Sequence, residues 1–93
     1  MDKVALVFPA FNASATLGAT IGEIPPGFGE FRILVDDASL DGTADEARRI
    51  GLDVRVHERN LGYGGNQKTC YTAALATGAD VVVMLHPDNQ YDA

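Results

Sequence analysis

The sequence has a single cysteine, few basic residues and no long apolar run, and each scarcity excludes a class of protein. Cys70, the only thiol, cannot form a disulfide within the chain. Seven lysines and arginines against thirteen aspartates and glutamates give a net charge of −6, which suits neither nucleic acid nor anionic lipid. Apolar runs fall far short of the roughly 20 residues of a membrane span, and Met1-Asp2-Lys3 leads into a strand rather than a signal peptide. We therefore expect a cytoplasmic chain without a nucleic-acid partner.

The composition favours one packed α/β domain over residues 1–93. Apolar residues make up 46% of the chain and charged residues 22%, so a hydrophobic core is expected. A chain this short buries roughly 60% of the surface that its unfolded form exposes, and its stability is marginal. The excess of acidic groups suits a divalent cation, which in turn can hold a phosphate.

Four short apolar segments have the composition of β-strands: Val4–Phe8, Ile33–Val35, Leu52–His57 and Val81–Leu85. Continuous β-branched runs are typical of parallel strands that are covered on both faces. The third segment differs, because Leu52, Val54 and Val56 alternate with polar residues. This alternation predicts a strand with one wet face at the edge of the sheet.

Three helices are expected between these strands: one with Leu17, Ile21 and Ile24 that ends at Pro25, one that begins at Thr43 and ends at Gly51, and one from about Gly65 to Thr77. Thr43 and Glu46 have the spacing of a capping box. The order strand–helix–strand, repeated along the chain, predicts a doubly wound parallel sheet with right-handed crossovers. The expected strand order is 3-2-1-4.

Polar residues gather where three of the predicted strands end. Asp36 and Asp37 follow the second strand, and His86, Asp88 and Gln90 follow the fourth. In an open parallel sheet the ligand site lies outside the carboxyl ends of the strands, so these side chains are expected at one rim. Because the chain stops a few residues beyond that rim, we expect it to be a fragment of a longer protein.

Three familiar motifs fail on specific residues. The turn after the first strand, from Pro9 to Ala15, lacks the glycines of a dinucleotide fingerprint. The glycine-rich segment that begins at Gly62 has Gln67 where a phosphate-binding loop needs its second glycine. A calcium loop that begins at Asp37 would have Arg48 at its twelfth position in place of glutamate.

The polar segments together resemble glycosyltransferase family 2, the inverting GT-A-type enzymes that include the dolichol-phosphate mannose synthases. The resemblance covers nearly the whole chain, with the motifs in family order and spacing. The matching segments are Pro9-Ala10-Phe11-Asn12, Val35-Asp36-Asp37-Ala38-Ser39-Leu40-Asp41-Gly42-Thr43, Asn60-Leu61-Gly62-Tyr63-Gly64-Gly65 and His86-Pro87-Asp88-Asn89-Gln90. The fold implied is the Rossmann-like, nucleotide-binding half of a GT-A domain, without the acceptor-binding half.

The resemblance implies transfer of a sugar from a UDP- or GDP-sugar to an acceptor, in the closest branch a polyprenol phosphate, with inversion and with Mg²⁺ or Mn²⁺. The catalytic base of the family lies later in the chain, so residues 1–93 alone are expected to be inactive. Membrane association is left open for the longer protein. The residues implied to bind the nucleotide are Pro9, Phe11, Asn12, Asp36, Asp37, Gly62 and Lys68, and those implied to bind the metal are Asp88, His86 and Gln90.

Two residues depart from the family pattern. Ala13 stands where the family usually has glutamate, which removes a polar contact near the nucleoside. His86 stands where the family has the first acid of its metal motif. Imidazole is a poor ligand for Mg²⁺ and an acceptable one for Mn²⁺. Either His86 ligates a softer metal, or it stands aside and Asp88 holds the ion.

Structural interpretations compete with several of these roles. Asp41 and Gly42 can serve only as a turn, and the glycines around Gly64 can simply permit a tight helix entry. His57 is expected to be solvated and Cys70 to lie in the core; Tyr63 and Tyr91 can line a site or be ordinary surface.

Two other functions remain to be compared with the transferase. One is a non-catalytic nucleotide-binding or folding module with a degenerate metal site, which Ala13 and His86 favour. A phosphatase-like or receiver-like domain needs its key acid directly after the first strand, where this chain has Phe8-Pro9. Half a sheet would also expose an apolar strand edge and favour self-association.

Overall fold

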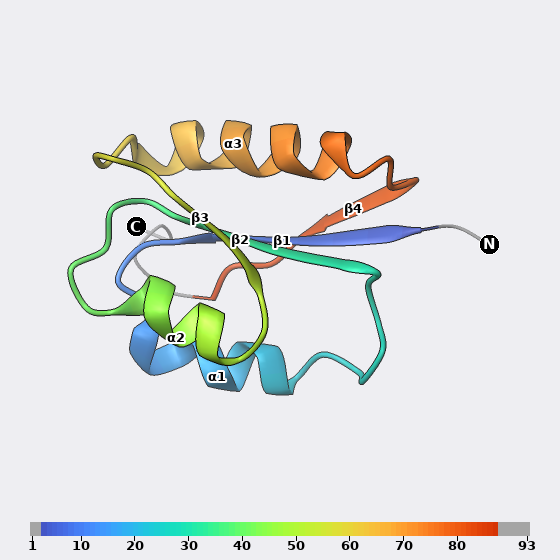
Figure 1. Ribbon diagram of the computed structural model, residues 1–93, viewed down its shortest axis with the longest axis horizontal. Coiled ribbons are helices and arrows are strands. Elements are labelled where there is room, and N and C mark those ends of the chain that lie inside the picture. Colours follow the sequence, from blue (N-terminus) through green and yellow to red (C-terminus); the bar gives the residue numbers. More distant parts are fainter. Residues whose placement is uncertain (1–2, 88–93) are drawn as a thin grey trace.

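The computed structural model describes residues 3–87, which form four strands and three helices (Figure 1). In chain order these are β1 (Val4–Ala10), α1 (Ser14–Gly22), β2 (Phe31–Asp36), α2 (Thr43–Arg49), β3 (Asp53–Val56), α3 (Gly62–Ala76) and β4 (Val81–Met84). All three pairings in the sheet are parallel and the strand order is β3-β2-β1-β4, which confirms the predicted topology. The alternating segment does form an edge strand.

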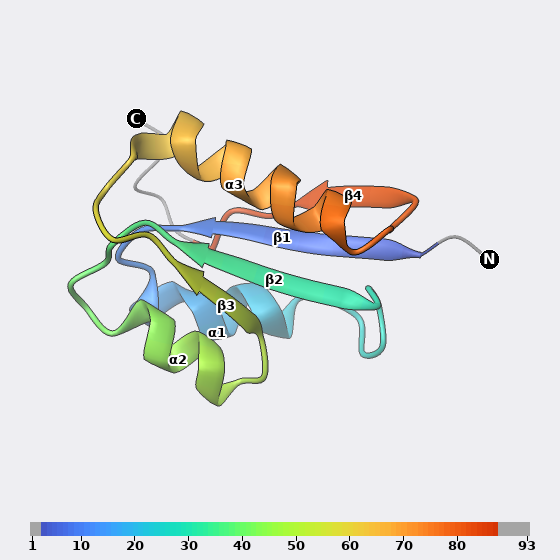
Figure 2. The same cartoon turned by 45° about the horizontal axis from the view of Figure 1, so that its top comes forward.

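The sheet is covered on both faces, as continuous apolar strands require. In Figures 1 and 2, α1 and α2 lie on one face and α3 lies on the other. Alternate residues of β1 serve the two layers: Leu6 and Phe8 pack with α1 and α2, whereas Ala5 and Val7 pack with α3. Each layer has its own buried cluster, so the central strand contributes to both cores.

Small side chains bring α3 close to the sheet. Cys70, Ala73 and Ala74 are buried against β1 and β2, as predicted for Cys70. Burial raises the pKa of the Cys70 thiol to about 12, so it stays protonated at neutral pH. Asn66, also fully buried, donates its amide group to the carbonyl oxygens of Val35 (3.0 Å) and Ala10 (3.4 Å). It ties α3 to both central strands where they end.

The first strand runs two residues further than predicted, through Pro9 to Ala10. Ala10 lies opposite Asp36 in the register with β2. The missing N–H of Pro9 costs no ladder bond, because it faces the β4 side of the strand, where the pairing has already ended at Met84. The longer strand brings Phe11 and Asn12 level with the end of β2.

The predicted capping box at the start of α2 is wrong. Gly42, with φ of +82°, occupies the N-cap position, and no side chain caps the helix there. Thr43 instead donates its hydroxyl to Asp41 and accepts a hydrogen bond from the Ala13 N–H at 2.8 Å. The Thr43 hydroxyl therefore bonds to Ala13, thirty residues away in sequence, rather than to the backbone N–H of Glu46 as the capping box requires.

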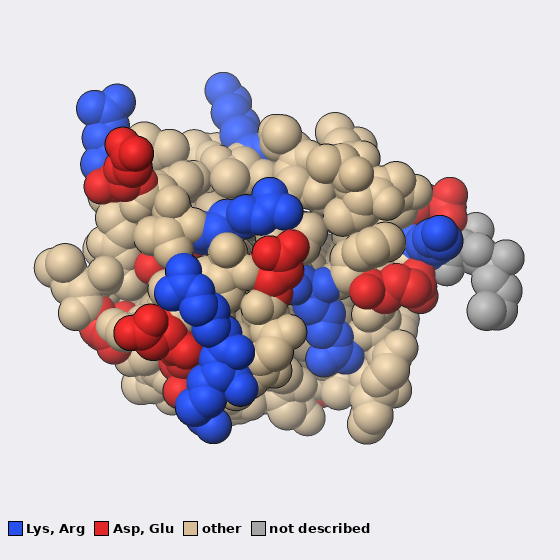
Figure 3. Space-filling model, in the orientation of Figure 1, with Lys and Arg blue, Asp and Glu red and all other residues tan. Residues whose placement is uncertain are grey.

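Basic and acidic side chains are interspersed on the face seen in Figure 3, with no patch of one sign. Three arginines pair with acids close by in sequence, through Arg48–Asp45, Arg49–Glu46 and Arg55–Asp53. Within residues 3–87 no helix has the length and hydropathy needed to cross a bilayer.

Candidate functional site

The candidate site lies at the carboxyl edge of the sheet, where the chain leaves all four strands. Asn12 and Ala38, the two non-glycine residues with positive φ in the described part of the chain, both lie in the loops at this edge. Left-handed backbone at such residues costs energy and persists where the surroundings hold it in place. The edge therefore carries local strain on the two loops that follow β1 and β2.

Asp36, at the end of β2, is a buried carboxyl with local hydrogen bonds. The residue is 3% exposed and accepts from the backbone N–H of Ser39 at 3.3 Å and from the Ser39 hydroxyl. Burial raises the pKa of Asp36; the bonds from Ser39 oppose that rise, and the charges of Asp41 and Asp37 add to it. A ligand that donates an N–H or O–H to this carboxylate would relieve the cost of keeping it charged.

Ser39 also links the loops that follow β1 and β2. Its hydroxyl oxygen accepts from the Asn12 N–H at 2.7 Å, while the Asn12 side-chain oxygen accepts from the Leu40 N–H at 2.9 Å. The Asn12 side chain thus holds the loop that carries Ser39. Sequence reasoning missed Ser39, although its position within the Asp-Asp-Ala-Ser segment was the available signal.

Asp37 faces inward and organises the start of α3. It is fully buried and accepts from the backbone N–H groups of Leu61 (2.8 Å) and Gly62 (3.0 Å) and from His57 Nδ1 (2.8 Å). A carboxylate at a helix N-terminus satisfies amides that have no partner within the helix. This contact starts α3 at Gly62, earlier than the predicted Gly65, and uses the N–H that Gly62 would offer to a phosphate.

His57 is not solvated, contrary to the prediction. Its side chain is 11% exposed, with Nδ1 against Asp37 and Nε2 at 2.8 Å from the Thr69 hydroxyl. The order Asp37–His57–Thr69 has the appearance of a nucleophilic triad. However, the Thr69 hydroxyl is held between His57 Nε2 and the Gly65 carbonyl one turn back, 3.2 Å away, so we interpret it as an anchor between β3 and α3.

Asp41 joins the N-termini of the two helices on the other face. It accepts from the backbone N–H and hydroxyl of Ser14 (3.1 and 2.9 Å) and from the N–H and hydroxyl of Thr43. Burial alone would raise the pKa of Asp41, but the hydrogen bonds from Thr43 and Ser14 hold it below its ordinary value of 3.8. This bonding agrees with the interpretation of Asp41 as a turn residue.

The segment after β4 is held from two sides. The Thr16 hydroxyl of α1 donates to the Pro87 carbonyl, and Pro87 is buried. On the α3 side, the Tyr63 hydroxyl lies 3.2 Å from His86 Nε2. His86 itself is exposed at the rim.

Asp88 and Gln90, the other two predicted metal ligands, lie outside the described residues. Within residues 3–87 no three His, Cys, Asp or Glu side chains come together as a metal site. The described part of the edge therefore contributes His86 alone of the predicted metal set.

The remaining predicted residues take different positions. Pro9 is fully buried within β1, Phe11 is half-buried just beyond it, and Lys68 is exposed on α3. Together with Asn12 and Asp36, Phe11 lies at the carboxyl edge, whereas the side chains of Pro9 and Asp37 belong to the interior. Their roles in nucleotide binding stay predictions.

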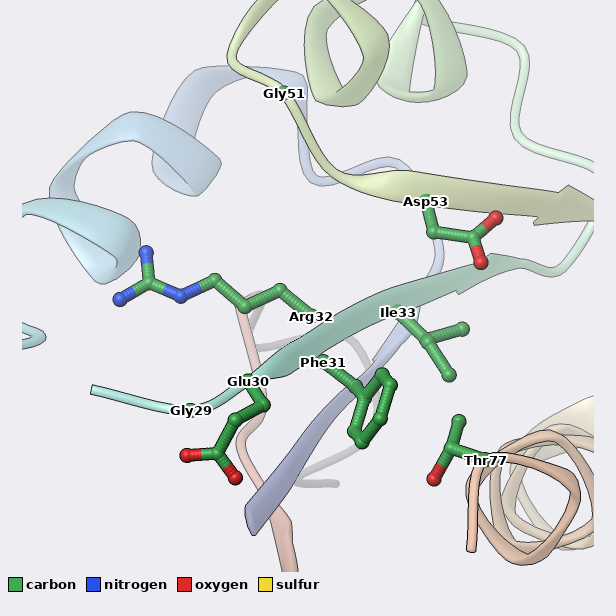
Figure 4. A pocket seen from close by; sticks show the side chains of 8 residues that line it. All are labelled: Gly29, Glu30, Phe31, Arg32, Ile33, Gly51, Asp53 and Thr77. Carbon is green, nitrogen blue, oxygen red and sulfur yellow. The ribbon is translucent and has the colours of Figure 1, made fainter. Parts of the chain in front are cut away.

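Two hollows differ in their chemistry. One of about 480 Å³ adjoins Asp36 between the end of β2 and the start of α2, and its lining includes Ser39, Leu40 and Val56. The other, of about 320 Å³, lies at the opposite edge of the sheet (Figure 4). There Glu30 accepts from the Val4 N–H and Arg32 donates to the Phe28 carbonyl, so the charged groups serve the local backbone. The hollow beside Asp36 is the better candidate.

Residues 5–93 match the family model for glycosyl transferase family 2, nearly the full length of the chain. The chain belongs to glycosyltransferase family 2. An uncharacterized glycosyltransferase of Mycobacterium tuberculosis is 34% identical over 92 residues, which are 99% of this chain and 39% of the relative. The undecaprenyl-phosphate mannosyltransferase of Micrococcus luteus is 33% identical over 95 residues, covering 96% of this chain and 39% of the relative. This family 2 chain thus spans about two fifths of the length of these curated relatives.

Solved structures agree with the family. Glucosyl-3-phosphoglycerate synthase of Mycobacterium tuberculosis, crystallised with Mn²⁺, UDP and glucosyl-3-phosphoglycerate, superposes with a TM-score of 0.76 at 27% identity, over 94% of this chain and 34% of that one. The same enzyme with Mg²⁺ and UDP gives a TM-score of 0.74 at 26% identity, over 94% and 34% of the two chains. These matches confirm the Rossmann-like GT-A fold.

Proposed function

We propose that residues 1–93 form the nucleotide-sugar-binding portion of an inverting glycosyltransferase, which uses a UDP- or GDP-sugar and a divalent cation. The observation that carries this proposal is Asp36, a buried carboxyl with a raised pKa beside a hollow at the carboxyl edge of a parallel sheet. Ligands of open α/β sheets bind at that edge, and a carboxylate accepts well from a base N–H or from ribose hydroxyls. UDP in a solved structure that this chain resembles supports this class of donor.

Different residues of the chain contact different parts of the nucleotide sugar in this proposal. Asp36 accepts hydrogen bonds from the nucleoside, Phe11 and Asn12 line its other side, and the Lys68 ammonium faces the diphosphate. Pro9 and Gly62 shape the backbone on either side, while Asp37 holds the edge together from within.

Asp88 and Gln90 are proposed as oxygen ligands of Mg²⁺ or Mn²⁺, since hard cations prefer such ligands. A divalent ion there would supply charge stabilisation to the departing nucleoside diphosphate. Both ions occur in solved structures that this chain resembles, which supports the choice. Thr16 fixes the backbone just before this pair through the Pro87 carbonyl.

The acceptor proposed for the whole protein is a polyprenol phosphate. One relative is an undecaprenyl-phosphate mannosyltransferase, and such an acceptor would bring the whole protein to a membrane surface. Since the catalytic base and acceptor site of the family lie in later sequence, we expect no transfer by residues 1–93 alone.

Titration with UDP and GDP, followed by backbone amide NMR shifts, tests the donor site. With Mg²⁺ present, shifts are expected at residues 11–12 and 36–40, and replacing Mg²⁺ by paramagnetic Mn²⁺ should broaden residues 86–90. Asp36→Asn should weaken binding about tenfold by removing a charged acceptor, whereas Asp53→Asn, at an exposed position by the opposite edge of the sheet, should not.

The alternative is a non-catalytic module with a degenerate metal site, for which Ala13 and His86 are the observations. A nucleotide affinity that is identical with and without metal would favour that alternative. Failure of both nucleotides to shift any residue at the carboxyl edge of a folded protein would refute the donor site itself.

A further inference from the structure

Ser39 occupies one of the two carboxylate oxygens of Asp36. The Ser39 backbone N–H donates to Asp36 Oδ1 at 3.3 Å, and the Ser39 hydroxyl contacts the same oxygen. The hydroxyl oxygen of Ser39 also accepts from the Asn12 N–H at 2.7 Å, so its own proton points to Asp36. Both donors of Ser39 therefore converge on Oδ1.

The second carboxylate oxygen of Asp36 remains for a ligand. An ionised carboxylate has about four lone-pair sites, two on each oxygen, and the two donors of Ser39 fill those of Oδ1. Oδ2 accepts from none of the residues that the structure describes. In that part of the chain every fully buried side-chain oxygen has a partner, so Oδ2 is not sealed in the core. It opens toward the hollow of about 480 Å³ that Asp36 lines.

Nucleobases differ in the number of N–H donors that they present to a carboxylate. Guanine has two adjacent donors, N1–H and the 2-amino group, which together match the two oxygens of an unoccupied carboxylate. Uracil has one donor, N3–H, between two carbonyl oxygens. A single oxygen accepts the uracil donor in a straight hydrogen bond, whereas the two guanine donors must both bend toward it or leave one unpaired. Bent bonds and unpaired donors in a desolvated site weaken binding.

We propose that Ser39 is a specificity-determining residue: by occupying Oδ1 it leaves Asp36 a single acceptor oxygen, which selects uracil over guanine. The loop around Ser39 is fixed for this role, since the Asn12 side-chain oxygen accepts from the Leu40 N–H at 2.9 Å while the Asn12 N–H donates to Ser39. The inference rests on the proposed function, because it names the base of the nucleotide that the site binds.

Affinities for nucleotides in the presence of Mg²⁺, measured by isothermal titration calorimetry, test the choice of base. UDP should bind about tenfold tighter than GDP, and N3-methyl-UDP, whose base has no N–H, should bind about tenfold more weakly than UDP. Equal or tighter binding of GDP, or undiminished binding of N3-methyl-UDP, would overturn the inference and leave the donor site standing. If neither UDP nor GDP binds, the proposed function fails as well.

Inosine diphosphate separates the number of donors from the size of the ring, since its base is guanine without the 2-amino group. The unsubstituted protein should bind GDP no tighter than inosine diphosphate. Ser39→Ala opens an acceptor site on Oδ1 and should then bind GDP about tenfold tighter than inosine diphosphate, even if a looser loop weakens both. Ser39→Thr keeps the hydroxyl, and Ser14→Ala removes a hydroxyl that donates to Asp41 instead, so both should keep the unsubstituted ratio. A ratio that Ser39→Ala leaves unchanged would overturn the role of Ser39.

Discussion

Asp36 and Asp37 are neighbours in sequence, yet their side chains point in different directions at the end of β2 and have different roles. Asp37 is enclosed by donors at the ends of β3 and α3, whereas Asp36 adjoins a hollow and accepts hydrogen bonds from Ser39. The alternation of side chains along an extended chain produces this division. Sequence reasoning predicted that both acids face the ligand; it could not predict the enclosure of Asp37, because the donors that surround it come from twenty or more residues away.

Asp36→Asn is expected to raise stability at neutral pH. Because the pKa of Asp36 is raised on folding, the folded state binds more protons than the unfolded state as the pH rises from 3.8 through the raised value, and stability falls over that interval. The amide has no charge to desolvate and can still accept from Ser39. Urea unfolding should show a higher midpoint for the variant at pH 7 and a smaller gain at the lowest pH at which the protein stays folded. A gain independent of pH would contradict this explanation.

Asp37→Asn is expected to destabilise the protein by about 3 kcal/mol, because an NH₂ group would face donors in a dry site. The free energy of urea unfolding measures the loss. Asp45→Asn, at an exposed position with one surface ion pair of 3.4 Å, should change stability by less than about 0.5 kcal/mol. Equal effects of the two substitutions would remove the structural role assigned to Asp37.

At the scale of helices and strands, sequence patterns predicted the features that depend on neighbouring residues. Apolar runs predicted the strands, and the handedness of crossovers supported the order β3-β2-β1-β4. The wrong predictions for His57 and Thr43 both involve partners from distant segments: His57 contacts Asp37 and Thr69, and Thr43 accepts a hydrogen bond from Ala13. A single sequence shows which residues can make hydrogen bonds but not which distant partner each will meet.

The close approach of α3 to the sheet predicts a sharp contrast between two alanines. Ala74 is fully buried against the sheet, while Ala76, two residues later, is exposed. Ala74→Leu should cost about 1–3 kcal/mol of unfolding free energy by overpacking, and Ala76→Leu should cost little. Thermal unfolding of both variants measures the difference. Similar stabilities would mean that α3 can move away from the sheet without cost.

At the scale of the whole molecule, β3 and β4 form the two ends of a four-stranded sheet. Beside β4 runs an apolar hollow of about 270 Å³, lined by Ile24, Phe28, Val83 and Leu85 among others. Unpaired strand edges and apolar surface together favour association. The candidate site uses the carboxyl edge of the sheet, so this lateral edge is separate from it.

Self-association through the β4 edge is accordingly expected in solution. Sedimentation velocity should show larger species as concentration rises, and Phe28→Ser, at a position that is 44% exposed, should shift the balance toward the monomer without lowering stability. Thr72→Ser on exposed α3 surface serves as the control. A single monomeric species at every concentration would contradict this expectation.

Asn66 has a consequence for how variation among relatives is interpreted. Its NH₂ group serves two carbonyl oxygens at the seam between β1 and β2, and its side-chain oxygen lies 3.6 Å from the Cys70 sulfur. A neutral side chain of that length with two donors leaves asparagine without a substitute in this dry site. Selection for folding alone would thus keep asparagine here as strictly as selection for activity would. An invariant polar residue beneath the carboxyl edge of a sheet can record the architecture of the sheet rather than the chemistry above it.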